Sequence, residues 1–215
     1  MLAVVASRLD PAAKELVAAW SSADAVLISA EDLSIAGWSF RVADPGGGSA
    51  VADSRLVPVS ELRAVLTRRP AVVAQELAWI DPADRTYLAA EMNAFLVAWL
   101  HALPCAVVNR PTTTCLAGPA WGPLEWAAAA ARADVPWAPD VDGVTHEAVV
   151  CGETCLGAAS PAEAAAARRL ARAADVELLG VRFTAGGACS ATPNPRLEDD
   201  DVREALLRHL VPGQG

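Results

Sequence analysis

Short apolar runs alternate with a helical pattern at the start of the chain. Residues 2–5 and 25–28 are continuous apolar runs of strand length. Between them stand Asp10 and Pro11, residues typical of a helix start, with the aspartate as N-cap and the proline in the first turn. A strand, a helix and a second strand in succession favour a parallel sheet. The chain is therefore expected to open with an α/β unit.

The pattern is less regular between residues 44 and 77. Residues 44–55 are rich in glycine and turn-forming residues and predict a hairpin or a flexible loop. A phosphate-binding loop is disfavoured there, because no strand precedes the glycines, no helix follows them and no lysine is present. Residues 59–69 predict a short helix with Ser60 as its N-cap. Residues 70–77 predict a strand.

The strongest helical pattern covers residues 81–103. Its apolar residues return to one broad face, and Pro104 ends it. Residues 105–111 predict a compact buried strand that runs into a polar turn. Another helix is predicted over residues 121–133.

The remaining residues predict a second unit that contains both strands and helices. Ser160 and Glu163 have the spacing of a capping box at the start of a helix over residues 160–174. The other predicted elements are a pair of short strands within residues 147–160 that turn at Gly152, antiparallel strands over residues 176–183 and 187–192, and a last helix over residues 197–210.

Composition narrows the possible functions. Hydrophobic residues make up 53% of the 215 residues, which is enough for a substantial core. The net charge of −9 argues against binding nucleic acid through its phosphates, because such binding needs clustered Lys and Arg. Of the 17 Lys and Arg residues, only Lys14 is a lysine. No apolar run reaches the length of a membrane span, so no membrane partner is expected.

The cysteines bear on location and on metal binding. Five cysteines and no recognisable export signal predict reduced thiols in a cytoplasmic protein. His146, Cys151 and Cys155 are an alternative metal-binding set, although C-x3-C is not the usual zinc spacing. The other interpretation treats these cysteines as small apolar residues in strands. The expectation is that the protein holds neither a metal nor another cofactor.

A polar turn, "NRPTTTC", follows the strand predicted over residues 105–111, at the edge where open α/β sheets place ligands. Cys115 is the candidate nucleophile in this turn, and a histidine would have to serve as its base. Arg110 and Arg182 either hold an anion such as a carboxylate or form surface ion pairs. The tryptophans near residue 121 either pack in the core or line a pocket. The ligand-binding candidates from this reasoning are Asn109, Arg110, Thr112, Thr113, Thr114, Trp121 and Arg182.

Three stretches, together with the order of the elements, resemble the ATP-grasp superfamily, especially its RimK-like ligases and peptide-modifying maturases. They are "VVNRP", in which Asn109 and Pro111 match an N-x-P turn, "ADVPWAPD" at residues 133–140, and "SATPNP" at residues 190–195. The resemblance implies a Rossmann-like parallel-sheet unit over residues 1–115, followed by a shortened ATP-grasp-like α+β unit over residues 116–215.

Departures from the family pattern affect its chemistry. The resemblance places the family's magnesium carboxylate at Arg182, its glutamate at Ser190 and its asparagine at Thr192. Mg²⁺ prefers hard oxygen ligands, usually carboxylates, and an arginine repels it. Asn194 remains within the motif and is a further ligand-binding candidate.

The family also grips nucleotide phosphates with lysines, and none follows Lys14. Residues 142–160 are too few for the central part of the family's nucleotide-binding domain. The resemblance and these losses predict a catalytically degenerate protein that binds a peptide or small molecule, or supports a partner enzyme, in peptide modification or natural-product biosynthesis. A homodimer or a partner enzyme is expected, because the shortened unit would leave apolar surface uncovered. Two alternatives stay open: an ATP-independent enzyme that uses the turn from Asn109 to Cys115, and a residual ATP-dependent carboxylate-amine ligase.

Overall fold

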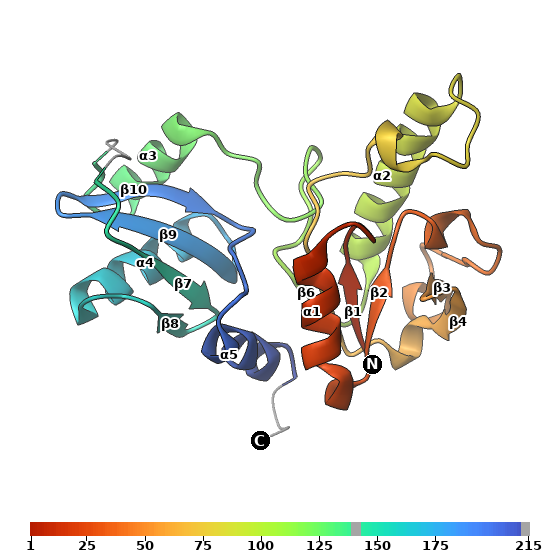
Figure 1. Ribbon diagram of the computed structural model, residues 1–215, viewed down its shortest axis with the longest axis horizontal. Coiled ribbons are helices and arrows are strands. Elements are labelled where there is room, and N and C mark those ends of the chain that lie inside the picture. Colours follow the sequence, from red (N-terminus) through yellow and green to blue (C-terminus); the bar gives the residue numbers. More distant parts are fainter. Residues whose placement is uncertain (139–142, 212–215) are drawn as a thin grey trace. The chain divides into compact units, whose positions relative to one another are not determined.

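The computed structural model describes residues 1–138 and 143–211, and the chain divides into two compact units, Met1–Ala117 (unit 1) and Gly118–Gly215 (unit 2) (Figure 1). Two residues of the stretch "ADVPWAPD", Pro139 and Asp140, lie outside the described residues. Over the described ranges, no helix combines the length and the apolar character that a membrane crossing requires.

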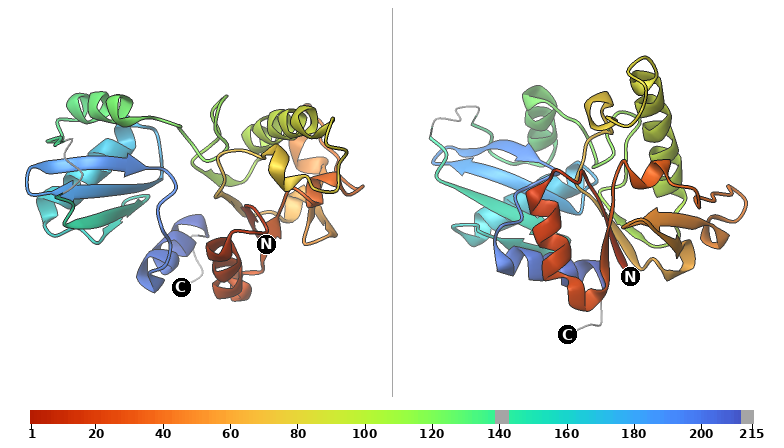
Figure 2. Two further views of the ribbon diagram at one scale, coloured as in Figure 1. Left: turned by 45° about the horizontal axis from the view of Figure 1, so that its top comes forward. Right: turned by 45° about the vertical axis from the view of Figure 1, so that its right-hand side comes forward.

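Unit 1 is built on a parallel sheet with the strand order β2-β1-β5-β6. Helices α1 and α2 lie on opposite faces of this sheet (Figure 2). The elements in chain order are β1 (Leu2–Val5), α1 (Pro11–Ala19), β2 (Ala25–Ile28), β3 (Ser49–Ala52), β4 (Arg55–Pro58), β5 (Ala64–Thr67), α2 (Arg85–Ala102) and β6 (Ala106–Val108), with short 3-10 helices that include η4 (Val59–Glu61) and η5 (Ala74–Glu76).

The predicted start of unit 1 is confirmed. All four residues of β1 are buried, as expected for a strand with neighbours on both sides. The Asp10 side chain accepts hydrogen bonds from the N–H groups of Ala12 (3.0 Å) and Ala13 (3.3 Å), so it is the N-cap of α1. Pro11 occupies the first turn.

Two predictions for residues 59–77 are wrong. Residues 64–67 of the predicted helix form strand β5, which is completely buried between β1 and β6. A strand buried on both faces shows a continuous apolar run, and periodicity alone does not distinguish such a run from a short helix. The strand predicted over residues 70–77 is instead a loop with the 3-10 turn η5. There Asn93 of α2 bonds both backbone groups of Val72 (2.8 and 2.9 Å) and takes the place of a neighbouring strand.

The glycine-rich stretch leads into a hairpin, as one of its two interpretations predicted. Strands β3 and β4 pair antiparallel from Ser49 with Pro58 to Ala52 with Arg55. The two residues of the turn, Asp53 and Ser54, have φ values of 47° and 61°. Positive φ at both central residues gives the twist that tight hairpins require.

Unit 2 is built on an antiparallel sheet with the strand order β10-β9-β7-β8. Helices α3 and α4 cover one face, and α5 lies on the other side (Figure 2, left). The elements are α3 (Pro123–Arg132), β7 (His146–Cys151), β8 (Thr154–Leu156), α4 (Pro161–Ala173), β9 (Leu178–Thr184), β10 (Gly187–Thr192) and α5 (Asp200–Leu210).

The core of unit 2 lies between the sheet and helices α3 and α4. Alternate residues of β9, among them Leu179, Val181 and Phe183, face this core together with Leu170 of α4. Ser160 Oγ accepts the N–H of Glu163 (3.2 Å), which confirms the predicted start of α4. The residues of β9 between the core positions therefore face the opposite side of the sheet.

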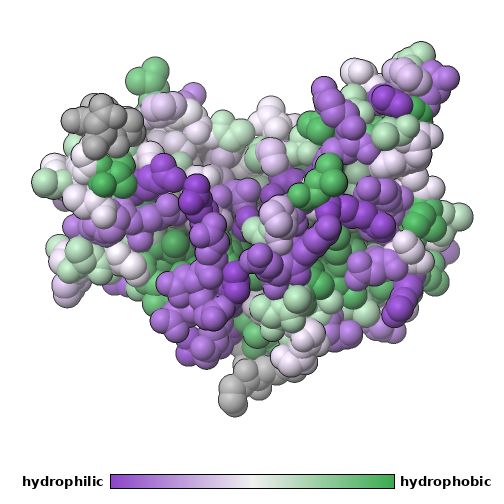
Figure 3. Space-filling view, in the orientation of Figure 1, coloured by the Kyte–Doolittle hydropathy of each residue, from purple (hydrophilic) through white to green (hydrophobic). Residues whose placement is uncertain are grey.

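Exposed apolar residues are few in unit 2. On the face shown in Figure 3, hydrophilic residues predominate and strongly hydrophobic ones occur in small separate areas. Among the described residues of unit 2, the exposed large hydrophobic side chains are Leu124 and Val144. The homodimer or partner enzyme expected from the sequence stays a prediction.

Candidate functional site

A row of polar residues crosses the sheet of unit 2 on the face opposite the core. Arg182 of β9 pairs in register with Glu147 of β7 on one side and with Ser190 of β10 on the other. Directly opposed residues of antiparallel strands have their side chains on the same face. The Nε of Arg182 lies 3.3 Å from Oε2 of Glu147, with about half of the arginine side chain (51%) and a quarter of the glutamate side chain (25%) exposed.

Gly180 lies two residues before Arg182 on β9, in the neighbouring row of the same face. Because glycine has no side chain, it leaves room for the carboxylate of Glu147. A Cβ built on Gly180 would lie 2.6 Å from Glu147 Oε1 and 2.9 Å from Cβ of Pro195. Any side chain at this position would therefore displace Glu147. Thr192 pairs with Gly180 across the sheet, and its Oγ1 accepts the N–H of Asn194 (3.2 Å).

We call Glu147, Arg182, Ser190, Thr192 and Asn194 the polar sheet face. Its central charges are an arginine and a carboxylate that already pair with each other. Apart from Glu147, the side-chain oxygen atoms in these two rows are the hydroxyls of Ser190 and Thr192. Hydroxyls are weaker ligands for Mg²⁺ than carboxylates. Among the described residues, no group of three or more His, Cys, Asp and Glu side chains is placed to hold a metal ion. The face has the donors to hold a carboxylate or a peptide carbonyl, because one guanidinium carries five N–H groups.

The predicted turn after β6 is held together by its own hydrogen bonds. Arg110 donates to the carbonyl oxygens of Leu100 (3.0 Å) and His101 (3.2 Å) at the end of α2. Thr112 Oγ1 accepts the N–H of Cys115 (3.1 Å). These contacts give Arg110 and Thr112 structural roles, since a cation at the end of a helix stabilises its last carbonyl groups.

Cys115 is not exposed as a nucleophile would need to be. Only 6% of the residue is exposed. Its backbone groups bond to Thr112, and no histidine in the described part of the chain forms a hydrogen bond with its thiol. The neighbouring Asn109 is buried and has a φ of 51°. Thr113 and Thr114 are exposed at the tip of the turn.

The sequence candidates divide between the units. Residues 109–115 lie in unit 1, whereas Trp121, Arg182 and Asn194 lie in unit 2. Trp121 packs edge-to-face on Trp126, with ring centroids 4.9 Å apart, and contacts the core of unit 2. Within unit 2, Arg182 and Ser190 lie opposite each other in one row of the sheet.

The alternative metal set is not brought together. His146 and Cys151 stand at the two ends of β7. The His146 ring bonds to Glu163 (2.9 Å) and stacks on Phe183. Burial raises the pKa of the Cys151 thiol to about 12 and also raises the pKa of Cys155, so both thiols stay protonated at neutral pH. A metal requires the thiolate form, so these two thiols are poor ligands.

Sequence reasoning missed a network of charged residues at the carboxyl ends of the strands of unit 1. Asp32, which follows β2, is completely buried and accepts hydrogen bonds from Ser29, Ser54 and Arg8. After β5, Arg68 pairs with Asp10, and Arg69 pairs with Glu76. The signal was the position of polar residues directly after apolar runs. It was lost for the two arginines, because β5 was predicted as a helix.

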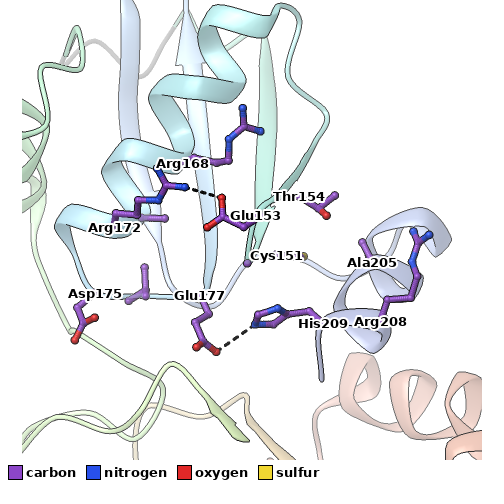
Figure 4. Close-up of a pocket in the computed structure, with 13 residues that line it drawn as sticks. Cys151, Glu153, Thr154, Arg168, Arg172, Asp175, Glu177, Ala205, Arg208 and His209 are labelled. Atoms are coloured by element: carbon purple, nitrogen blue, oxygen red, sulfur yellow. Dashed lines mark hydrogen bonds and ion pairs between the residues drawn. The ribbon is translucent and has the colours of Figure 1, made fainter. Parts of the chain in front are cut away.

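Sequence reasoning also missed a pocket of about 780 Å³ in unit 2 (Figure 4). Its walls come from α4 and α5, and the turn between β7 and β8 closes one side. The sequence held two signals of a cationic pocket: two arginines one helical turn apart on α4, and the pair Arg208 and His209 on α5. The lining residues are Cys151, Gly152, Glu153, Thr154, Arg168, Ala171, Arg172, Asp175, Val176, Glu177, Ala205, Arg208 and His209.

No protein-family model matches the chain, and no match to a curated protein was found. Solved structures, however, share its fold. The ATP-grasp ligase PsnB complexed with a minimal precursor aligns over 98% of each chain, with a TM-score of 0.70 and 11% sequence identity. The macrocyclase MdnC from Microcystis aeruginosa MRC, bound with precursor peptide MdnA, aligns over 98% of this chain and 99% of its own, with a TM-score of 0.72 and 8% identity.

A RimK domain protein from Sphaerobacter thermophilus DSM 20745 is also similar, with a TM-score of 0.54 and 16% identity over 97% of this chain and 98% of its own. At such identities the likeness shows the fold alone. The chain therefore has an ATP-grasp-like fold of the kind found in peptide-modifying ligases. In this chain, a parallel sheet of four strands precedes an antiparallel sheet of four strands.

Proposed function

We propose that this chain is a catalytically degenerate ATP-grasp-like protein that binds a peptide or a small molecule, or supports a partner enzyme, in peptide modification or natural-product biosynthesis. The observation that carries the proposal is the ion pair between Arg182 and Glu147 on the polar sheet face. Arg182 stands where the resemblance to ATP-grasp ligases expects a magnesium carboxylate. The pair places a fixed cation at that position.

The physical argument concerns phosphate charge. Activating a carboxylate with ATP requires positive groups that neutralise the transferring phosphate, mostly Mg²⁺ and lysines. Arg182 and Glu147 neutralise each other, which leaves no spare carboxylate in their row for a metal. The single lysine, Lys14, lies in α1 of unit 1. These residues do not fit magnesium-dependent ligation.

A peptide is the ligand that the similar structures favour. PsnB and MdnC, which share the fold, were solved with the precursor peptides PsnA2 and MdnA. On the polar sheet face, Nε of Arg182 bonds Glu147, while half of the side chain remains exposed. Its other N–H groups suit a carboxylate or a backbone carbonyl of a bound peptide. Binding of this kind needs neither metal nor nucleotide.

Calorimetry with ATP and Mg²⁺ tests the loss of ligase chemistry. We expect no heat of binding and no shift in melting temperature. The positive control is the same titration with an active ATP-grasp ligase whose affinity for the nucleotide is known. Clear micromolar binding of ATP would contradict the proposal and would return the residual ligase to first place.

Sedimentation analysis tests the accessory role separately. A chain that works on a partner or as a dimer is expected to sediment as a dimer at micromolar concentration, or as a heterocomplex once the partner is added. A monomer that also forms no complex with the modifying enzyme of the same pathway would exclude the scaffold role. The peptide-binding role would then be the one to pursue.

A further inference from the structure

The pocket between α4 and α5 in unit 2 is lined by both charged and small apolar residues. Arg168 and Arg172 come from α4, whereas Arg208 and His209 come from α5 (Figure 4). The apolar part consists of the small residues Cys151, Ala171, Val176 and Ala205. These small side chains leave room for the chain of a ligand between the charged groups.

Two of the acidic residues in the pocket already have partners. Glu153 bonds Arg172 at 2.6 Å, and Glu177 bonds His209 at 3.2 Å. Figure 4 shows both pairs as dashed lines and shows Asp175 with its carboxylate directed away from Arg168. These acids therefore leave the cations Arg168 and Arg208 to other partners.

Arg168 and Arg208 are the cations whose charge is least satisfied. Arg168 is half-buried, and the described residues provide no hydrogen bond or ion pair to its guanidinium. Arg208 lies 3.9 Å from Glu204, and more than half of each side chain is exposed. An exposed pair at such a distance contributes little stability. Burying part of an unpaired cation is unfavourable, so a ligand that supplies an anion would stabilise the pocket.

We propose that this pocket binds a ligand that carries two or more separated carboxylates, one for Arg168 on α4 and one for Arg208 on α5. Arg168 and Arg208 stand on opposite walls and do not converge on one point (Figure 4). A single phosphate would therefore meet one arginine, and its double charge would face Glu153 and Glu177 nearby. Carboxylates spaced along an acidic peptide, or on a small polycarboxylate, reach both walls.

The site goes beyond the proposed function, because it lies away from the polar sheet face and requires no nucleotide. It is formed by the end of β7 that is remote from Glu147, since Cys151 is the last residue of that strand. Loss of binding here would leave the interpretation of Arg182 untouched. Failure of the two inferences is therefore distinguishable.

Calorimetry of the full chain with a short blocked peptide of alternating glutamate and alanine tests the site. The protein has a net charge of −9, so an acidic peptide is repelled unless a dedicated cationic site receives it. We expect binding at low salt that weakens at high salt. We expect no binding of the same peptide with glutamine in place of glutamate. Arg168→Gln and Arg208→Gln are each expected to weaken binding by roughly five- to tenfold.

Arg132→Gln is the matched control, because Arg132 is an exposed arginine of α3 in the same unit that does not line the pocket. It is expected to leave the affinity unchanged. Succinate in place of the peptide separates the sources: equal affinity assigns the site to a small dicarboxylate, and weaker affinity assigns it to a peptide. Four results would overturn the proposal. The first two are no binding of either probe and equal binding of the glutamine peptide. The others are an affinity unchanged in both Arg168→Gln and Arg208→Gln, and tighter binding of inorganic phosphate than of the peptide.

Discussion

Replacing Asp32 by asparagine is predicted to destabilise unit 1 strongly. Asp32 is completely buried, and its carboxylate accepts four hydrogen bonds. Oδ2 accepts the N–H (2.9 Å) and the hydroxyl (2.6 Å) of Ser29. Oδ1 accepts the N–H of Ser54 (2.8 Å) and a guanidinium N–H of Arg8 (3.2 Å). The carboxylate therefore ties the end of β2 to the turn of the β3–β4 hairpin.

The magnitude follows from the number of acceptors. An asparagine has one oxygen, so Asp32→Asn keeps at most two of the four hydrogen bonds. Its NH₂ group then faces donors that had been satisfied, either at Ser29 or at Ser54. Two lost hydrogen bonds at about 1 kcal/mol each, and one buried N–H left without an acceptor at ~1–3 kcal/mol, give a loss of about 3–5 kcal/mol. A typical domain has a total stability of about 5–15 kcal/mol.

The assay is denaturation in urea followed by hydrogen exchange and mass spectrometry, which reports peptides of each unit separately. Asp53→Asn is the matched control, because the exposed Asp53 carboxylate accepts the N–H of Leu27 at 3.3 Å from the same hairpin turn. It is expected to change the stability of unit 1 by less than about 1 kcal/mol. If Asp32→Asn lost no more than this control, the argument from buried acceptors would be refuted.

Two further predictions concern the turn at Gly152. Gly152 has a φ of 58°, and a Cβ at this position would lie 2.5 Å from Nδ1 of His209. Gly152→Ala is therefore expected to destabilise unit 2 by roughly 1–3 kcal/mol, measured in the same exchange assay. Gly143→Ala, where the nearest atom to a Cβ is 3.9 Å away, should have a smaller effect, and equal effects would contradict the steric reasoning. The hydrogen bond from His209 to Glu177 raises the pKa of this histidine above its ordinary value of 6.5. The stability that the protonated histidine contributes is therefore fully present below pH 6.5 and is lost as pH rises through the raised pKa. An NMR titration should place its midpoint above 6.5, and His209→Gln should remove this part of the pH dependence; a midpoint at or below 6.5 would contradict the pairing.

Local signals made much of the fold predictable. Asp10 with Pro11, and Ser160 with Glu163, mark helix starts through bonds between residues a few positions apart. Strands β9 and β10 follow each other with a tight turn, so their antiparallel pairing was also visible in the sequence. Such features depend on neighbours along the chain, and the structure confirms them.

The missed elements depend on residues far away in the sequence. Strand β5 is recognisable only once β1 and β6 are placed on its two sides. Residues 70–77 lack a strand because Asn93, on a helix that follows, takes the backbone groups of Val72. No pattern within either stretch carries this information.

The same distinction applies to the candidate sites. The resemblance singled out Arg182 and Ser190 one by one, and only the strand register shows that they lie opposite each other. The role of Arg110 at the end of α2 depends on how β6 packs beside that helix. The sequence therefore predicted only an anion contact or a surface ion pair for this residue. The pocket near Gly152 joins residues from β7, α4 and α5, and only the folded chain brings these together.

The strand order of unit 1 has a consequence for the biosynthesis of the chain. β1 is translated before the strands it pairs with: Leu2 pairs with Ala25 on one side and with Ala64 on the other. β5 in turn pairs with β6 at Ala106, which is translated later still. Pairing over such separations is slow, because loops must close before contacts form. The hairpins of unit 2, by contrast, join residues as near as Cys151 and Thr154 or Thr184 and Gly187. We therefore expect assembly of the parallel sheet to be the rate-limiting step of folding. One edge of the apolar strand β5 stays unpaired, and open to chaperones, until Ala106–Val108 have been translated.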